Sequence, residues 1–199
     1  MEWHPNIEMY LSTMKWLCPD LKDFHLTEFA NCLETRSFDK NEVLFQEGST
    51  QEHVVFVAKG LVRVFYNDQK GDEKTSWFVK DQEFATDYPS FLTGERSHYT
   101  FQCLEPCETV WLPKQAIYKG YETFPELQKY GRLVAEEIIR QQQERIASFL
   151  FKNAKQRYLD FIENSSPLLN RISVGHLASY LGIERQSLTR IRKEILAEK

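Results

Sequence analysis

The stretch Ile172–Lys193, ISVGHLASYLGIERQSLTRIRK, predicts two short helices joined by a tight turn. The first helix is expected to begin at about Ser173, because serine is a strongly preferred N-cap residue. Gly182 is expected to end it, since glycine readily adopts the left-handed conformation found just past helix ends, and the second helix is expected over about Glu184 to Ile195. Apolar residues recur at helical spacing on one face of each helix. They are Leu177, Ala178 and Leu181 in the first helix and Leu188, Ile191 and Ile195 in the second.

The other face of the second helix carries side chains suited to nucleic acid. Arginine matches the edge of guanine with two hydrogen bonds and glutamine matches adenine, whereas lysine and threonine suit phosphates. Such a face is typical of a helix-turn-helix, whose second helix enters the major groove of DNA. A basic amphipathic helix is also compatible with a merely solvated surface. The residues of this face are Arg185, Gln186, Thr189, Arg190 and Lys193.

The charge of the chain is unevenly distributed. The residues from Phe151 to Lys199 contain 9 Lys and Arg against 5 Asp and Glu, whereas the first 150 residues contain 16 against 24. A basic end on an acidic body suits a module that binds a polyanion and is attached to a domain with another task. The charge distribution therefore favours DNA binding over a merely solvated helix face.

The composition predicts a cytoplasmic protein without membrane segments. The chain has 199 residues and 42% hydrophobic content, and no apolar run approaches the ~18 residues of a membrane helix. The first ten residues, MEWHPNIEMY, lack the basic and apolar regions of a signal peptide. Because no C-x-x-C pair is present and the five histidines are scattered, free thiols are favoured over a metal or iron–sulfur site. The cysteines are Cys18, Cys32, Cys103 and Cys107.

The pattern along the chain changes from helical to β-rich and back to helical. Residues 1–35 are expected to be helical. Between about Arg36 and Pro113, short runs rich in Val, Phe and Tyr are separated by turn residues such as Gly60, which predicts a small antiparallel barrel or sandwich. Within it, residues 61–66 alternate between two sets of side chains, as expected of a strand with one exposed face.

The segment from Phe124 to about Lys152 is expected to be one long helix, because it is continuous in good helix formers. Its apolar seam is too long for one domain to bury, and a homodimer is the simplest source of a partner helix. Packing of the seam wholly on the barrel is the alternative. Asn153 and Gln156 resemble the capping box of a further helix, which Pro167 ends. The seam residues are Leu127, Tyr130, Val134 and Ile138.

This order of barrel, long helix and helix-turn-helix resembles the CRP/FNR superfamily of bacterial transcription regulators over nearly the whole chain. The strongest parts are Arg157–Tyr158–Leu159, HLASYLGIERQSLTRIRKEI at 176–195 and VVFVAKGLVRVFYNDQKGDEK at 54–74. The resemblance implies an α+β chain whose N-terminal part is a double-stranded β-helix, a jelly-roll-like barrel with flanking helices. The implied domains are the effector-type barrel at 1–123, the dimerisation helix at 124–152 and the all-α helix-turn-helix domain at 153–199.

The resemblance also implies a function and partners. Such proteins are homodimers that bind a palindromic operator in double-stranded DNA, contact RNA polymerase and are not enzymes. A small effector at the barrel shifts the dimer between two arrangements, and a hinge near Asn153 re-aims the helix-turn-helix domains. By position, Arg185, Gln186 and Arg190 match the base-reading residues of the family. Ser187, Thr189 and Lys193 match positions that contact phosphates.

The chain departs from the family pattern in its C-terminal part. It stops at Lys199, directly after the second helix of the helix-turn-helix, so the two-stranded wing of the family is expected to be missing. Glu184 stands where a serine or threonine N-cap is usual. A carboxylate suits a helix N-terminus, but here it would lie close to DNA phosphate.

The effector cassette departs further. The family motif opens with Gly-Glu and closes with Arg-Ser-Ala, whereas this chain has Thr-Asp and Arg-Ser-His. A β-branched residue obstructs the close backbone approach that glycine permits, so a cyclic nucleotide is less favoured than an unidentified small molecule or no effector. Two glutamines of the long helix occupy the positions that usually touch the base. The candidate effector-binding residues are Thr86, Asp87, Arg96, Ser97, Gln142 and Gln143.

Two other classes of function are alternatives to a DNA-binding regulator. A cyclic-nucleotide-type sensor that acts through protein contacts is suggested by the absent wing and by Glu184. A cupin-type enzyme would need clustered histidine and carboxylate ligands in the barrel. Only His53 and His98 lie in the β-rich region, 45 residues apart, so catalysis is not expected.

Overall fold

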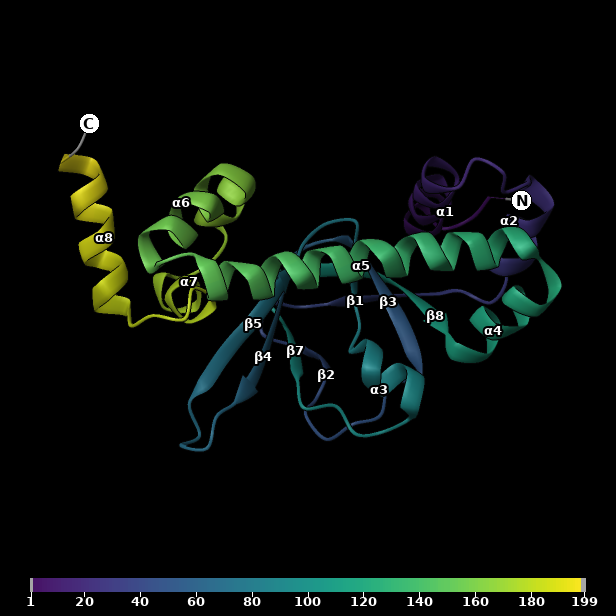
Figure 1. Cartoon of the computed structure of the whole chain (residues 1–199). Helices are drawn as coiled ribbons and strands as arrows, with labels where there is room; N and C mark the ends of the chain where they lie inside the picture. Colours follow the sequence, from purple (N-terminus) through teal and green to yellow (C-terminus); the bar gives the residue numbers. More distant parts are fainter. Residues whose placement is uncertain (1, 198–199) are drawn as a thin grey trace. The chain divides into compact units, whose positions relative to one another are not determined.

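The computed structural model describes residues 2–197 and divides into two compact units (Figure 1). The first unit contains the chain up to Val64 together with Phe78–Glu137. The second contains Phe65–Trp77 together with the residues from Ile138 onward. Two strands and the long helix therefore begin in one unit and end in the other.

The β-rich region forms two four-stranded sheets, and the predicted jelly-roll-like barrel is confirmed. The strand orders are β1-β8-β3-β6 in one sheet and β2-β7-β4-β5 in the other, so successive strands of the chain alternate between sheets except β4 and β5, which are neighbours in the same sheet. Antiparallel pairing of β1 with β8 runs from Glu34 opposite Trp111 to Phe38 opposite Cys107. The strands are β1 (Glu34–Phe38), β2 (Val43–Phe45), β3 (His53–Lys59), β4 (Val62–Asn67), β5 (Glu73–Val79), β6 (Glu83–Ala85), β7 (Thr100–Cys103) and β8 (Cys107–Pro113).

The expectation that one face of β4 is exposed is wrong. Its residues are buried from Val62 through Phe65, and the side chains become exposed only at Tyr66. Arg63, the charged residue of this alternating run, is only 3% exposed. A fully buried arginine is one whose guanidinium is paired, and Arg63 has such an interaction, so a single charged residue in an alternating run does not establish an exposed face.

Helices cover the barrel and complete its core. α1 (Pro5–Leu17) packs against β3 and β8, and the ring of Tyr10 lies 5.1 Å from that of Phe56. The expected helical N-terminus is thus confirmed as two helices, which give way to β1 before residue 35. The other helices of this unit are α2 (Asp23–Ala30), α3 (Tyr88–Thr93), α4 (Lys114–Thr123) and the first part of α5 (Pro125–Phe151).

The long helix α5 is confirmed, but three of the four seam residues expected to face a partner pack in the barrel unit instead. Leu127 and Tyr130 are buried in the core of the barrel unit, and Val134 packs against that core. The exposed apolar residues of α5 lie further along, where Ile139 is 60%, Ile146 is 51% and Leu150 is 70% exposed. The helix therefore has two apolar faces, and the seam predicted to face a partner lies mostly on the face that packs on the barrel unit.

The C-terminal helices begin where the sequence predicts. The Gln156 N–H donates to Asn153 Oδ1 at 3.0 Å and the Asn153 N–H donates to Gln156 Oε1 at 2.9 Å, which completes a capping box. At the next N-cap, the Ser173 hydroxyl oxygen accepts from the His176 N–H at 3.0 Å. The elements are α6 (Ala154–Ser165), the 3₁₀ helix η1 (Ser166–Asn170), α7 (Val174–Tyr180) and α8 (Arg185–Ala197).

Gly60 allows the β3–β4 turn to pack closely on the start of β8, which yields a prediction about stability. Its φ is +119°, and a Cβ there would lie 2.6 Å from Cys107 Sγ and 2.9 Å from the Cys107 Cα. We expect Gly60→Ala to lower the free energy of unfolding by about 3 kcal/mol or more, because it adds a clash to an unfavourable φ. Urea unfolding of the purified chain measures this loss.

Gly48→Ala is the matched control, since Gly48 has φ +85° but no atom within 4 Å of the added Cβ. It isolates the backbone penalty, about 1–2 kcal/mol. Equal losses in the two variants would show that the close contact with Cys107 contributes nothing.

Candidate nucleic-acid interface

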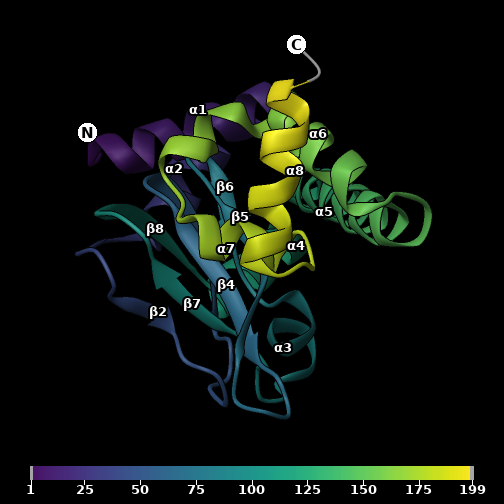
Figure 2. The same cartoon turned by 90° about the vertical axis from the view of Figure 1, so that its left-hand side faces the viewer.

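The second helix of the helix-turn-helix is α8 (Figure 2). Its polar side chains are exposed, and the apolar side chains of the opposite face are buried or half-buried. Leu188 and Ile191 are buried as expected, whereas Ile195 is only half-buried. Of the six residues predicted to contact DNA, Ser187 is half-buried and the other five are exposed. The exposed five are Arg185, Gln186, Thr189, Arg190 and Lys193.

Two of these side chains have weak local interactions. The Arg190 side chain is 76% exposed, and its Nε lies 3.8 Å from a Glu194 carboxylate oxygen one turn along the helix. An exposed pair of this kind adds little stability, so the guanidinium can leave it for a base edge at small cost. The Thr189 hydroxyl donates to the Arg185 carbonyl at 3.0 Å and retains its acceptor capacity.

Arg192 shows the opposite behaviour. Its Nε donates to the Tyr158 hydroxyl at 3.0 Å, and its guanidinium carbon lies 5.5 Å from the centre of the Tyr158 ring. This arginine ties α8 to α6 instead of facing outward. The arginines of α8 are thus divided between an outward set and one that fixes the helix to its own unit.

The turn between α7 and α8 is a Schellman motif. Gly182 has φ +67°, its N–H donates to the Ser179 carbonyl at 3.0 Å, and the Ile183 N–H donates to the Ala178 carbonyl at 3.0 Å. The prediction that Gly182 ends the first helix is confirmed. A Cβ at this glycine would lie 2.7 Å from Cε1 of Phe149, so the turn also packs closely on the end of α5.

Two arginines bind the next two carbonyl groups. Arg145 donates through Nη2 to the Tyr180 carbonyl, and its guanidinium lies 3.7 Å from the Tyr180 ring centre and 4.5 Å from that of Phe149. Arg157 donates through Nε and Nη2 to the Leu181 carbonyl at 3.1 and 2.9 Å. Burial lowers the pKa of Arg145. These contacts fasten the helix-turn-helix to α5 and α6.

The same end of α7 binds the hairpin of β4 and β5. The Thr75 N–H of β5 donates to the Ser179 hydroxyl oxygen at 2.8 Å. At the hairpin tip, one Asp68 carboxylate oxygen accepts from the N–H groups of Lys70 and Asp72 at 2.9 and 3.0 Å. The tip of the β4–β5 hairpin and the helix-turn-helix belong to the same unit.

Sequence reasoning missed Arg145 and Phe149. They lie four residues apart on α5, and Arg145 reaches a carbonyl 35 positions along the chain. The i, i+4 spacing of an arginine and an aromatic residue is too common to indicate a functional contact. Among the residues that hold this turn, only Arg157 belongs to a stretch that resembles the family in sequence.

The six candidate effector residues lie in both units. In the barrel unit, the Thr86 hydroxyl donates to the Ala85 carbonyl at 2.7 Å and accepts from the Val55 N–H at 3.3 Å, so it closes the junction of β3 and β6. Asp87 is 6% exposed and makes no side-chain bond to the helix it precedes. Ser97 is buried, while Arg96 is exposed. Gln142 and Gln143 are exposed on the part of α5 that belongs to the second unit.

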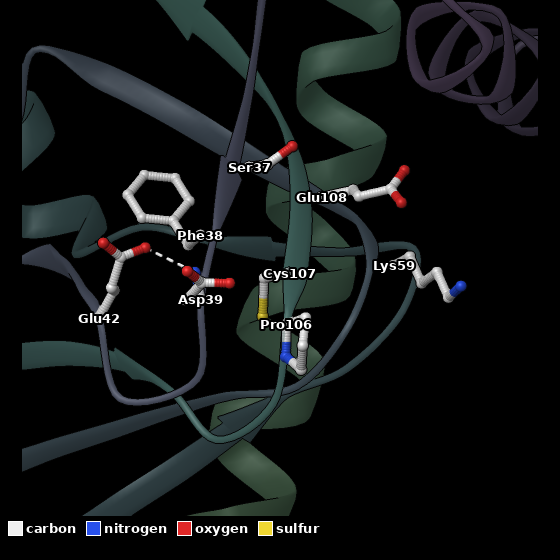
Figure 3. Close-up of a pocket in the computed structure, with 8 residues that line it drawn as sticks. All are labelled: Ser37, Phe38, Asp39, Glu42, Lys59, Pro106, Cys107 and Glu108. Atoms are coloured by element: carbon white, nitrogen blue, oxygen red, sulfur yellow. Dashed lines mark hydrogen bonds between the residues drawn. The ribbon is translucent and has the colours of Figure 1, made fainter.

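A pocket of about 440 Å³ lies elsewhere on the barrel unit (Figure 3). Glu42 accepts the N–H of Asp39 within it. None of the six candidate effector residues lines it, so it gives no support to the predicted effector site. Its lining residues are Ser37, Phe38, Asp39, Glu42, Lys59, Pro106, Cys107 and Glu108.

Two searches of the described residues bear on other kinds of site. Between residues 2 and 197, no three His, Cys, Asp or Glu side chains come together as metal ligands would. Over the same residues, no helix has the length and apolar character needed to span a membrane.

Comparison with known proteins gives matches over most of the chain. Residues 35–124 match the cyclic nucleotide-binding domain family. The fumarate and nitrate reduction regulatory protein of Vibrio cholerae is 24% identical over 199 residues, covering 90% of this chain and 78% of that protein. Electron transport regulator A of Shewanella oneidensis is 26% identical over 173 residues, covering 78% of this chain and 66% of that protein.

Solved structures share the fold. FixK2 from Bradyrhizobium japonicum superposes with a TM-score of 0.70 at 15% identity, covering 83% of this chain and 85% of that one. A regulator of the CRP/FNR family from Eubacterium rectale gives a TM-score of 0.70 at 17% identity, covering 92% and 87%. The domain match covers the barrel region and the solved structures share the fold over most of the chain, so this chain is similar to members of the CRP/FNR family.

Proposed function

We propose that this chain is a DNA-binding transcription regulator that acts as a homodimer under the control of a small effector. The observation that carries the proposal is the geometry of α8, whose apolar face is buried while Arg185, Gln186 and Arg190 stand exposed together. The curated relatives named above are regulatory proteins. In a helix-turn-helix, the second helix packs on its own domain through one face and enters the major groove with the other.

The residues of α8 divide by the kind of contact they suit. Arg185, Gln186 and Arg190 carry the groups that pair with base edges, so they would read the sequence. Thr189 and Lys193 are exposed and suit phosphate contacts, which fix position without reading bases. Ser187 is half-buried, so its hydroxyl is the least accessible of the six. Affinity should fall with salt, at a log–log slope of about −0.9 per phosphate neutralised.

Arg190→Ala tests this assignment. The variant should bind its best duplex about 1–3 kcal/mol more weakly and lose base preference at one position in each half-site, because one bidentate contact is removed. Fluorescence anisotropy with the best duplex and with its point variants measures both effects.

The control for Arg190→Ala is Arg140→Ala, which removes the same charge from an exposed site on α5 where the arginine pairs with Glu144. The two variants would behave alike if Arg190 acted only through net charge. That result would remove the base-reading role.

A homodimer is supported by the apolar stripe on the second part of α5. Ile139 and Ile146 lie seven residues apart and Leu150 follows four residues later, so all three fall on one helix face. All three are exposed within the chain. Pairing of this face with a second copy would bury it, and a twofold dimer would match a palindromic operator with half-sites about 34 Å apart.

Ile146→Glu should therefore convert the dimer to a monomer, because it places a charge in the centre of the apolar stripe. Sedimentation equilibrium measures the change, and operator binding should fall with it. Gln141→Glu adds the same charge at an exposed position of α5 on another face and should leave the dimer intact. A wild-type chain that sediments as a monomer at micromolar concentration would contradict the dimer.

The proposed effector is a small molecule bound by the barrel unit. The match to a cyclic nucleotide-binding domain supports a small ligand in the segment 86–97, where Arg96 is exposed and Ser97 is buried. The Thr86 hydroxyl is already bonded to backbone groups, so it would contribute no contact. These features favour a small molecule other than a cyclic nucleotide.

A further inference from the structure

The C-terminal end of α7 has a complete set of partners for its carbonyl groups. A helix leaves its last four carbonyls without intrahelical donors. In α7, the Schellman bonds bind the carbonyls of Ala178 and Ser179. Arg145 binds that of Tyr180, and Arg157 binds that of Leu181. Half of this set therefore depends on arginines from outside the helix-turn-helix.

The two arginines lie on opposite sides of the junction between α5 and α6. Arg157 is part of α6, beyond Asn153, whereas Arg145 is part of α5, before it. A bend at Asn153 that moved the helix-turn-helix relative to α5 would have to break the bond from Arg145 to the Tyr180 carbonyl. The bond from Arg157 to Leu181 need not break in that movement.

From this difference we infer that Arg145 is a positioning residue for DNA recognition: it holds the end of α7, and thereby the start of α8, in a fixed orientation on α5. The inference rests on the proposed DNA-binding function. α8 begins three residues after Gly182, so this short turn allows α7 and α8 little movement relative to each other. In a dimer that pairs through the apolar stripe of α5, this helix would thus set the distance between the two copies of α8.

The contacts of Arg145 require the planar shape of a guanidinium. It lies 3.7 Å from the centre of the Tyr180 ring and 4.5 Å from that of Phe149 while it donates to the Tyr180 carbonyl. A flat, weakly hydrated cation stacks on aromatic faces and keeps its donors in the plane, whereas the ammonium of lysine is a strongly hydrated point charge. Phe149 also packs against Gly182, so the same aromatic ring touches the arginine and the turn.

The test compares three variants of the full chain on DNA. Arg145→Gln removes the contact, Arg145→Lys keeps the charge without the planar fork, and Arg140→Gln removes an exposed charge from the same helix. The duplexes are the one that the wild type binds best, the same half-sites separated by one to three additional or fewer base pairs, and a scrambled sequence.

We expect Arg145→Gln and Arg145→Lys to lose about tenfold in affinity for the best duplex and to lose most of the preference for its half-site spacing. Binding to scrambled DNA should change less than twofold, because the phosphate-contacting residues of α8 are untouched. Arg140→Gln should match the wild type. Equal loss on all duplexes, or an unchanged spacing preference, would overturn the inference.

Hydrogen exchange followed by NMR tests the same contact without DNA. In Arg145→Gln, the amides of Gly182 and Ile183 should exchange about tenfold faster than in the wild type and in Arg140→Gln. Unchanged exchange would overturn the positioning role whatever the DNA result. A wild-type chain that fails to distinguish its best duplex from scrambled DNA would overturn the proposed function alone, since exchange would still decide the role of Arg145.

Discussion

The C-terminal turn of α7 is the constraint on which the position of α8 depends. A helix that stops must find donors for its last carbonyl groups, and each buried carbonyl left without one carries a desolvation penalty. Here the left-handed Gly182 turns the chain so that two carbonyls are bound locally. The remaining two are bound by arginines from neighbouring helices. Because α8 follows directly, the direction of α8 is fixed by the same bonds that complete α7.

The long helix combines two tasks in separate parts of its length. Its first part contributes Leu127 and Tyr130 to the core of the barrel unit. Its second part exposes an apolar stripe that begins at Ile139, and on another face it carries Arg145 and Phe149 against the helix-turn-helix. If two copies pair along this stripe as proposed, a change in that pairing would reach the turn before α8 through side chains of the same helix. That arrangement suits a regulator in which dimer geometry and DNA spacing are linked.

Sequence patterns predicted the elements of the fold better than their partners. The N-caps at Asn153 and Ser173 and the helix end at Gly182 follow from interactions within a few residues, and all three are confirmed. The outward face of α8 was also predictable, because helical periodicity separates Leu188 and Ile191 from the polar residues.

The errors concern packing between distant residues. Periodicity located an apolar seam on α5 but did not show whether the barrel or a second copy covers it. Alternation in β4 suggested an exposed face, although Arg63 is buried. Arg145 was missed because its partner lies 35 residues away.

The central claim is that paired α8 helices read a symmetric DNA site, and selection of bound sequences from random duplexes tests it most directly. We expect an inverted repeat whose half-sites lie about one helical turn apart, whereas a recovered pool without sequence preference would contradict the claim.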